Sequence, residues 1–205
     1  MSDPGWYGDM HTAVSPGRLR VIERARPHRL RWCISWLDRH EIDVVRSQAA
    51  LARRPALRRL VRISNVLGNG WVYPLVTIAL FVVHPSRALG AIEAAVSAVV
   101  IAHIVYPFAK AFVGRERPCD RCADLPAFTK PFDRYSCPSG HSMTACAAFL
   151  PVGVVFPIVG AIAACLWLIL AWARIAAAHH YPTDVLVGGI LGAIAALPPM
   201  YLLLR

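Results

Sequence analysis

Five long apolar runs constrain what this chain can fold into more than any other feature of its sequence. They occupy residues 66–83, 88–108, 142–156, 159–178 and 185–204. Within them only Glu93 and Arg174 carry a charge. A helix needs roughly 20 apolar residues to cross a hydrocarbon core about 30 Å thick, and the third run reaches that length if residues 139–141 form its first turn. We therefore expect an all-α fold, a polytopic membrane helix bundle with about five transmembrane helices.

A water-soluble helical bundle is the alternative interpretation of these runs. Hydrophobic residues make up 57% of the chain and charged residues 17%, against roughly 45–50% and 25% in an ordinary soluble domain. Five such runs within residues 66–205 leave too few polar faces for a bundle surrounded by water. The composition therefore favours the membrane.

The basic residues are concentrated before the first apolar run. Thirteen of the 22 Lys and Arg residues, all of them arginines, precede residue 66 together with six acids, so this part holds +7 of the net charge of +10. In residues 18–65 the arginines alternate with apolar side chains such as Trp32 and Trp36. We interpret this segment as one or two amphipathic helices in the membrane interface, split at Pro55. Nucleic-acid binding is the other use of such a segment, but no recognition motif accompanies it.

These patterns divide the chain into three parts. Residues 1–17 are polar, lack the apolar stretch of a signal peptide and are predicted to be disordered. Residues 18–65 form the basic interfacial segment. Residues 66–205 form the transmembrane bundle, and its chemistry must lie in the polar residues that interrupt or flank the spans.

The loop after the second run begins with Lys110 and, seven positions later, the pair Arg117-Pro118. Lysine supplies a compact cation and arginine a planar fork of donors, so the two together can hold several oxygens of one phosphoryl group. Positive flanks of a membrane helix are the alternative explanation.

The same loop ends with Pro138-Ser139-Gly140-His141, directly before the third run. Free backbone N–H groups at a helix start form an anion site, and Gly140 would let the backbone approach an oxyanion closely. His141 is then placed to transfer a proton near neutral pH. A capped helix with an incidental histidine is the alternative.

The junction before the last run contains Arg174, His180 and Asp184. An arginine inside an apolar run is costly and is a functional candidate by default. Pro182 suits the first position of the last helix. Asp184 lies four residues after His180, so its carboxylate could accept from one imidazole nitrogen and leave the other free to attack. A membrane-surface ion pair is the alternative.

Together, Lys-x6-Arg-Pro, Pro-Ser-Gly-His and Arg-x5-His-x3-Asp resemble the three-part signature of the type 2 phosphatidate phosphatase superfamily. These membrane lipid phosphate phosphatases include proteins like phosphatidylglycerophosphatase B and undecaprenyl pyrophosphate phosphatase. The motifs extend from Lys110 to Asp184, and the helix pattern extends the likeness over most of the chain. One departure is Ala173, where the family usually has serine before the arginine.

The resemblance implies a role for each motif residue. His180 is the nucleophile that forms a phosphohistidine, Asp184 orients it, and His141 protonates the leaving group and later activates water. The phosphate is held by Lys110, Arg117, Arg174 and the N–H groups of Ser139 and Gly140. The resemblance implies hydrolysis of a lipid phosphate or polyprenyl (di)phosphate in the bilayer, with no metal or other cofactor.

Three of the six cysteines, Cys119, Cys122 and Cys137, lie in the polar loop between the first two motifs. With His141 they have spacing compatible with zinc, but zinc would take the imidazole that a phosphatase needs as an acid. A disulfide between two of the three is expected if the loop faces an oxidising compartment, and the pair stays open.

The two faces of the membrane differ in charge. With five spans, the basic segment and both motif regions share one face, and the positive-inside rule would place that face in the cytoplasm. Bacterial members of the resembled family usually act on the outer face, and phosphate or headgroup binding accounts for several of these cations. We therefore expect a multi-pass protein of the plasma (inner) membrane with its active site on the extracytoplasmic face.

Two other function classes remain. A vanadate-binding haloperoxidase has a similar anion site, but those proteins are soluble. A non-enzymatic carrier or lipid-binding protein could use the same cationic pocket and would release no inorganic phosphate.

Overall fold

The computed structural model describes residues 28–125, 131 and 133–204. These residues form helices and connecting turns, and among them there is no strand, only one isolated bridge between Glu116 and Tyr135. The elements are α2 (His28–Leu51), α3 (Pro55–Val66), the π-helical turn η1 (Leu67–Trp71), α4 (Val72–Val83), α5 (Pro85–Val113), the single turn α6 (Pro118–Arg121), α7 (Gly140–Val155), α8 (Pro157–Ala176) and α9 (Pro182–Leu203). The expected all-α fold is confirmed.

The five apolar runs each become a helix. Four helical stretches are long and apolar enough to cross a membrane, and they are Pro55–Val83, Pro85–Val113, Pro157–Ala176 and Pro182–Leu203. The third run forms the shorter α7, of 16 residues, which takes Gly140 and His141 into its first turn with Ser139 as its N-cap.

Proline and glycine mark the helix boundaries. A proline stands at the start of α3, α5, α8 and α9, where its missing N–H costs nothing and its fixed φ suits a helix. Pro182 begins α9, as the sequence predicted. The first span continues from α3 through η1 into α4 with a kink at Gly70, whose φ is 117°. The predicted boundary at residues 65/66 falls inside this continuous helical stretch.

Side-chain size is distributed as in a membrane bundle. Apart from Lys110, the buried residues of α5 are all alanines, namely Ala88, Ala91, Ala94, Ala98 and Ala102. Large apolar side chains are turned outward instead, for example Leu75, Ile158 and Leu202, which are 68%, 78% and 72% exposed. Small residues let membrane helices approach closely, while large ones face lipid. With its apolar helices, the chain is a multi-pass membrane protein, and the soluble-bundle alternative is wrong.

Two glycines bring α9 against the start of α7. A Cβ at Gly188 would collide with the backbone of Ser139, and a Cβ at Gly192 would collide with the backbone of Met143. Because neither residue has a side chain, the second and third turns of α9 lie in direct contact with the first turn of α7, and the second and third motifs lie beside each other.

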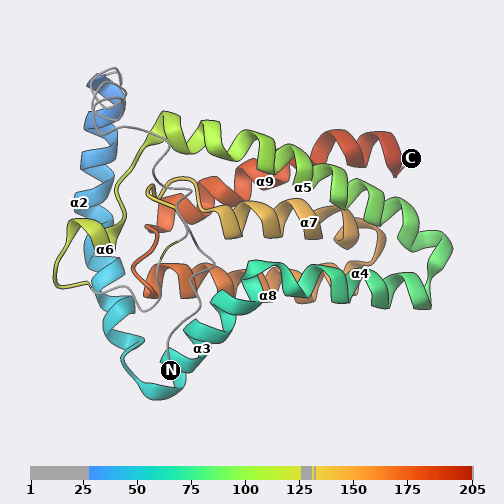
Figure 1. Cartoon of the computed structure of the whole chain (residues 1–205), viewed down its shortest axis with the longest axis horizontal. Helices are drawn as coiled ribbons and strands as arrows, with labels where there is room; N and C mark the ends of the chain where they lie inside the picture. Colours follow the sequence, from blue (N-terminus) through green and yellow to red (C-terminus); the bar gives the residue numbers. More distant parts are fainter. Residues whose placement is uncertain (1–27, 126–130, 132, 205) are drawn as a thin grey trace, which may run out of the picture.

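Helix α2 lies across one end of the bundle (Figure 1). At this end α5 and α8 finish and α7 and α9 begin, so all three motifs gather beside α2. Trp32 and Trp36 on α2 are 59% and 43% exposed. The break before Pro55 separates α2 from α3, while the interfacial position of residues 18–65 stays a prediction. The predicted disordered tail, residues 1–17, lies outside the described residues.

Candidate active site

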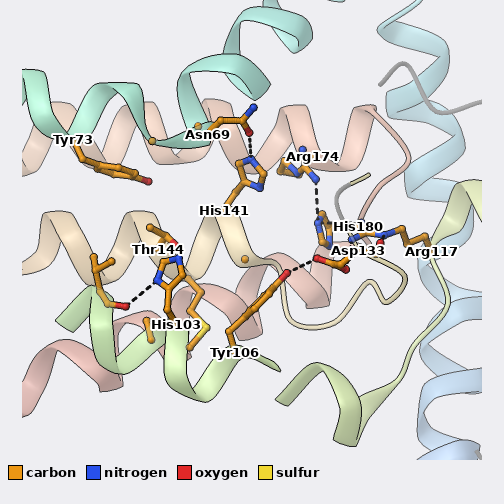
Figure 2. Close-up of a pocket in the computed structure, with 16 residues that line it drawn as sticks. Asn69, Tyr73, His103, Tyr106, Arg117, Asp133, His141, Thr144, Arg174 and His180 are labelled. Carbon is orange, nitrogen blue, oxygen red and sulfur yellow. Dashed lines mark hydrogen bonds and ion pairs between the residues drawn. The ribbon is translucent and has the colours of Figure 1, made fainter. Parts of the chain in front are cut away.

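A cavity of about 390 Å³ at the α2 end of the bundle collects residues from all three motifs. Arg117, Gly140, His141, Arg174 and His180 line it (Figure 2). The other predicted site residues, Lys110, Ser139 and Asp184, are buried nearby. Lys110 donates to Asp133, which also lines the cavity. The N–H of Ser139 donates to the carbonyl of Asp184, and the carboxylate of Asp184 lies 3.9 Å from His180.

His180 is buried between the second and third motifs, and its two ring nitrogens have different partners. Nδ1 lies 2.7 Å from the carbonyl oxygen of Ser136. Because a carbonyl only accepts, Nδ1 carries the hydrogen and Nε2 has a free electron pair. Burial first, and then the charges of Arg174 and Arg117, hold the pKa of His180 well below its usual value. The ring is therefore neutral, with an electron pair available at Nε2.

Two guanidinium groups surround this nitrogen. Arg117 Nη1 and Arg174 Nη2 each lie 3.4 Å from His180 Nε2. The neighbouring His179 contributes its backbone, since its carbonyl accepts from Arg117 Nη1 at 2.7 Å. The spacing to Asp184 selected His180 over His179, and it is His180 whose side chain lines the cavity.

Asp184 does not make the hydrogen bond to His180 that its spacing suggested. Its Oδ2 lies 3.9 Å from His180 Nδ1. The carboxylate is instead bound by Arg115 Nη1 at 2.7 Å and by the backbone N–H of Tyr181 at 2.8 Å. Ser136, a backbone acceptor that the sequence analysis missed, therefore fixes the ring, and Asp184 acts on it through charge at longer range.

Arg174 is a buried cation whose described partners are all neutral. It is 4% exposed, its Nη1 donates to Asn65 Oδ1 at 2.5 Å, and its Nη2 faces His180. Its Nε is buried without a hydrogen-bond partner among the described residues. A buried charge is strongly unfavourable unless it is paired, so the surroundings of Arg174 suit an anion.

Lys110 and Arg117 share a carboxylate that the sequence analysis also missed. Asp133 Oδ1 accepts from Lys110 Nζ at 2.8 Å and from Arg117 Nη2 at 2.7 Å. Burial by itself would raise the pKa of Asp133, but Lys110 and Arg117 outweigh it, and the pKa lies below its usual value. In the sequence, Asp133 is only an acid five positions before Pro138, and nothing distinguishes it from the other acids of this loop.

The start of α7 provides fewer donors than predicted. The N–H of Ser139 donates to the carbonyl of Asp184 at 2.9 Å because α9 approaches so closely, so it is not available to a phosphate. The hydroxyl of Ser139 is buried without a partner among the described residues. Gly140 lines the cavity, and a Cβ there would lie 2.9 Å from the ring of Tyr106. The glycine is needed because Tyr106 occupies the space.

His141 is held from the opposite wall of the cavity. Its Nε2 lies 2.9 Å from Asn69 Oδ1 in η1, and both residues line the cavity (Figure 2). In the sequence, Asn69 is marked only by the Gly-Asn-Gly sequence that interrupts the first apolar run, and this sequence does not indicate a partner. The first span thus reaches the candidate general acid, a contact that no local pattern predicts.

Arg115, two positions before Arg117, belongs to a separate cluster. It donates to Asp38 at 2.8 Å and to Glu41 at 2.7 Å, both on α2, and to Asp184 at 2.7 Å. Its guanidinium also lies 3.8 Å above the ring of Tyr181. This cluster attaches α2 to the carboxylate beside His180.

All six cysteines are free, so none of the three in the loop forms a disulfide in this structure. Among the described residues, no group of three or more His, Cys, Asp or Glu side chains is placed to hold a metal ion. The zinc spacing noted in the sequence therefore does not correspond to a cluster here. Ala173, the departure from the family signature, is fully buried in an apolar cluster with Ala52 and Val61.

The family model of the PAP2 superfamily matches residues 91–204, more than half of the chain. The chain belongs to the PAP2 superfamily. The resemblance drawn from the three motifs is thereby confirmed.

One curated protein is similar to the chain in sequence, and two solved structures are similar to it in fold. The chain is 36% identical over 102 residues to a lipid A 1-phosphatase of Rhizobium johnstonii, a match that spans 46% of this chain and 41% of that protein. The fold is similar to LpxE of Aquifex aeolicus, with a TM-score of 0.67 and 23% identity over 78% of this chain and 94% of that one. It is also similar to a transmembrane PAP2 type phosphatidylglycerolphosphate phosphatase of Bacillus subtilis, with a TM-score of 0.60 and 19% identity over 90% and 92%.

Proposed function

We propose that this PAP2 protein is an integral-membrane phosphatase that hydrolyses a lipid phosphate or a polyprenyl (di)phosphate. The main support is the pairing of Arg174, a buried cation without a carboxylate partner among the described residues, with the unprotonated Nε2 of His180 3.4 Å away. A phosphoryl group bound here would compensate the charge of Arg174 and bring phosphorus within reach of Nε2. Two of the three similar proteins are named as phosphatases of phosphorylated lipids, and these names support the same class of substrate.

In the first half-reaction, His180 Nε2 attacks phosphorus in line with the oxygen of the leaving group. The N–P bond forms as the P–O bond to the lipid breaks, and His141 gives the leaving oxygen a proton. The products are a phosphohistidine and the dephosphorylated lipid. Asp184, held by Arg115, stabilises the positive charge that develops on the imidazole.

In the second half-reaction, water attacks the phosphohistidine. His141, now without its proton, accepts one from the water, the N–P bond breaks, and inorganic phosphate leaves. Both histidines return to their starting state, so the cycle consumes one water and releases one phosphate. The hydrogen bond to Ser136 keeps the proton on Nδ1 throughout.

Arg117 and Arg174 supply the electrostatic part of the mechanism. Phosphoryl transfer depends mostly on positioning and on stabilising charge on the equatorial oxygens. Two guanidinium groups beside Nε2, with Lys110 bound to the same carboxylate as Arg117, perform the task that a metal ion performs in other phosphatases. We therefore expect activity that does not depend on added metal and persists in excess EDTA.

The decisive experiment measures phosphate release by the purified protein from a panel of lipids. The panel contains phosphatidate, phosphatidylglycerol phosphate, a lipid A 1-phosphate and polyprenyl mono- and diphosphates. We expect release from at least one of them, and a loss of at least about 10⁴-fold in His180→Ala, as for a covalent nucleophile. His179→Ala is the matched control and should remain folded and far more active than His180→Ala.

The carrier and haloperoxidase alternatives predict other results. A carrier binds the same lipids but releases no phosphate, and His180→Ala then changes nothing in the assay. A haloperoxidase-like site is disfavoured by the membrane spans. An active His180→Ala protein would exclude the phosphohistidine mechanism.

Location and sidedness belong to the same proposal. We place the protein in the plasma (inner) membrane with the α2 end of the bundle on the extracytoplasmic face. Cys33 on α2 is exposed, so an impermeant maleimide should label it on intact cells. Labelling only after the cells are lysed would place the site in the cytoplasm.

A further inference from the structure

Asp133 occupies donors that the first motif provides for a phosphate. Its Oδ1 binds both Lys110 and Arg117, and its Oδ2 accepts from the hydroxyl of Tyr106 at 2.5 Å. Asp133 and His180 line the same cavity (Figure 2). The predicted phosphate cradle therefore already holds an anion, and that anion comes from the protein itself.

A carboxylate and a phosphoryl group bind to such donors in the same way. Both present oxygens that carry negative charge, and arginine and lysine form their strongest hydrogen bonds with either. The side chains of Lys110 and Arg117 are 6% and 2% exposed. Without substrate these buried cations need a negative partner, and Asp133 provides it.

Asp133 and a phosphate bound to the same two cations would repel each other. A phosphate monoester carries about two negative charges near neutral pH, and like charges in contact repel strongly where the dielectric constant is low. A phosphate that binds Lys110 Nζ and Arg117 Nη2 must therefore replace Asp133 Oδ1. Asp133 is the partner that can move, because a third of its side chain is exposed whereas both cations are buried.

We propose that Asp133 determines the affinity of the site by competing with the substrate phosphate for Lys110 and Arg117. This inference rests on the proposed function, because the competitor is the phosphate that His180 would attack. Breaking the interactions of Asp133 with the two cations makes the free energy of substrate binding less favourable. Asp133 favours product release, because its carboxylate returns to the two cations as inorganic phosphate leaves.

Equilibrium binding of orthovanadate to the purified full chain in detergent tests this directly. Asp133→Asn removes the competing charge with little change in shape, and we expect it to bind vanadate about tenfold more tightly than the wild type. Inorganic phosphate should likewise become a stronger inhibitor of any lipid hydrolysis. Asp133→Glu keeps a carboxylate and is expected to bind vanadate much as the wild type does.

The matched control is Asp124→Asn, which removes the same charge from an exposed residue of the same loop that pairs with Arg46. It should leave vanadate affinity unchanged. Should Asp133→Asn fail to purify as folded protein, Asp133→Ser removes the same charge and gives the same comparison. Equal or weaker vanadate binding in the charge-removing variant would show that Asp133 supports the cations and does not compete.

Lipid hydrolysis measured on the same samples separates this inference from the proposed function. A wild type that binds vanadate but releases no phosphate from any lipid contradicts the proposed function. Unchanged vanadate affinity on removal of Asp133 contradicts the competition, whatever the activity. The two failures are therefore distinct.

Discussion

Arg115 and Arg174 are both buried arginines, 3% and 4% exposed, but they have opposite kinds of partner. Arg115 donates to three carboxylates, those of Asp38, Glu41 and Asp184. Arg174 donates to the neutral amide of Asn65 and faces the neutral ring of His180. Among the described residues, no carboxylate pairs with Arg174.

The difference distinguishes a structural cation from a binding one. A buried arginine surrounded by acids is fully compensated and stabilises the fold as long as the set is complete. A buried arginine without an anion is unfavourable in the empty protein, and that cost is relieved only when a ligand supplies the charge. Arg117 lies between these cases, because its carboxylate, Asp133, is partly exposed.

The largest expected effect is on activity at Arg174. Arg174→Gln removes a cation that faces the reacting phosphate, and we expect kcat/KM for the lipid substrate to fall about 10²–10³-fold. The melting temperature should stay equal or rise, because an uncompensated buried charge is lost. A phosphate-release assay and thermal unfolding of the same preparation measure both quantities. A clear loss of stability would show that Arg174 is structural like Arg115.

The next effect is on stability at Arg115. Arg115→Gln removes the cation that three carboxylates share, and of the three only Asp38 keeps another cation, Arg121. We expect a loss of about 3–5 kcal/mol in the free energy of unfolding. Denaturant unfolding in detergent would measure it. If Arg115→Gln proves as stable as the wild type, the distinction between the two arginines is lost.

The smallest effect concerns the attachment of α2. Glu41 accepts from Arg115 and from the N–H and hydroxyl of Thr183 at the start of α9. Glu41→Gln weakens these charge-assisted bonds, with an expected loss of about 1–3 kcal/mol. Asp43→Asn is the control on the same helix, since Asp43 is 82% exposed and its loss should not change unfolding measurably. Equal effects of the two variants would mean that the helix is held by other contacts.

Much of this architecture was predictable because its signals are local. Apolar runs, prolines at helix starts and motif spacing each depend on neighbours within a few turns, and they located the spans and the group around His180. The helical pattern also predicted that the two motif regions share one end of the bundle.

The contacts that were missed join distant parts of the chain or use backbone atoms. Ser136 binds His180 through a carbonyl that every residue possesses, so its identity gives no signal. Asn69 reaches His141 from 72 residues away, and Asp38 reaches Arg115 from 77 residues away. Asp184 fitted the spacing for a bond to His180, but Arg115 and a backbone N–H occupy its oxygens instead.

Arg174 has only neutral partners among the described residues, and we infer that the substrate supplies the anion that pairs with it. Isothermal titration of orthovanadate into the wild type, Arg174→Gln and the exposed α3 control Arg62→Gln tests it without any need for turnover. We expect the wild type and Arg62→Gln to bind vanadate alike, and Arg174→Gln to bind it at least about 100-fold more weakly. Equal affinity in all three proteins would contradict the account.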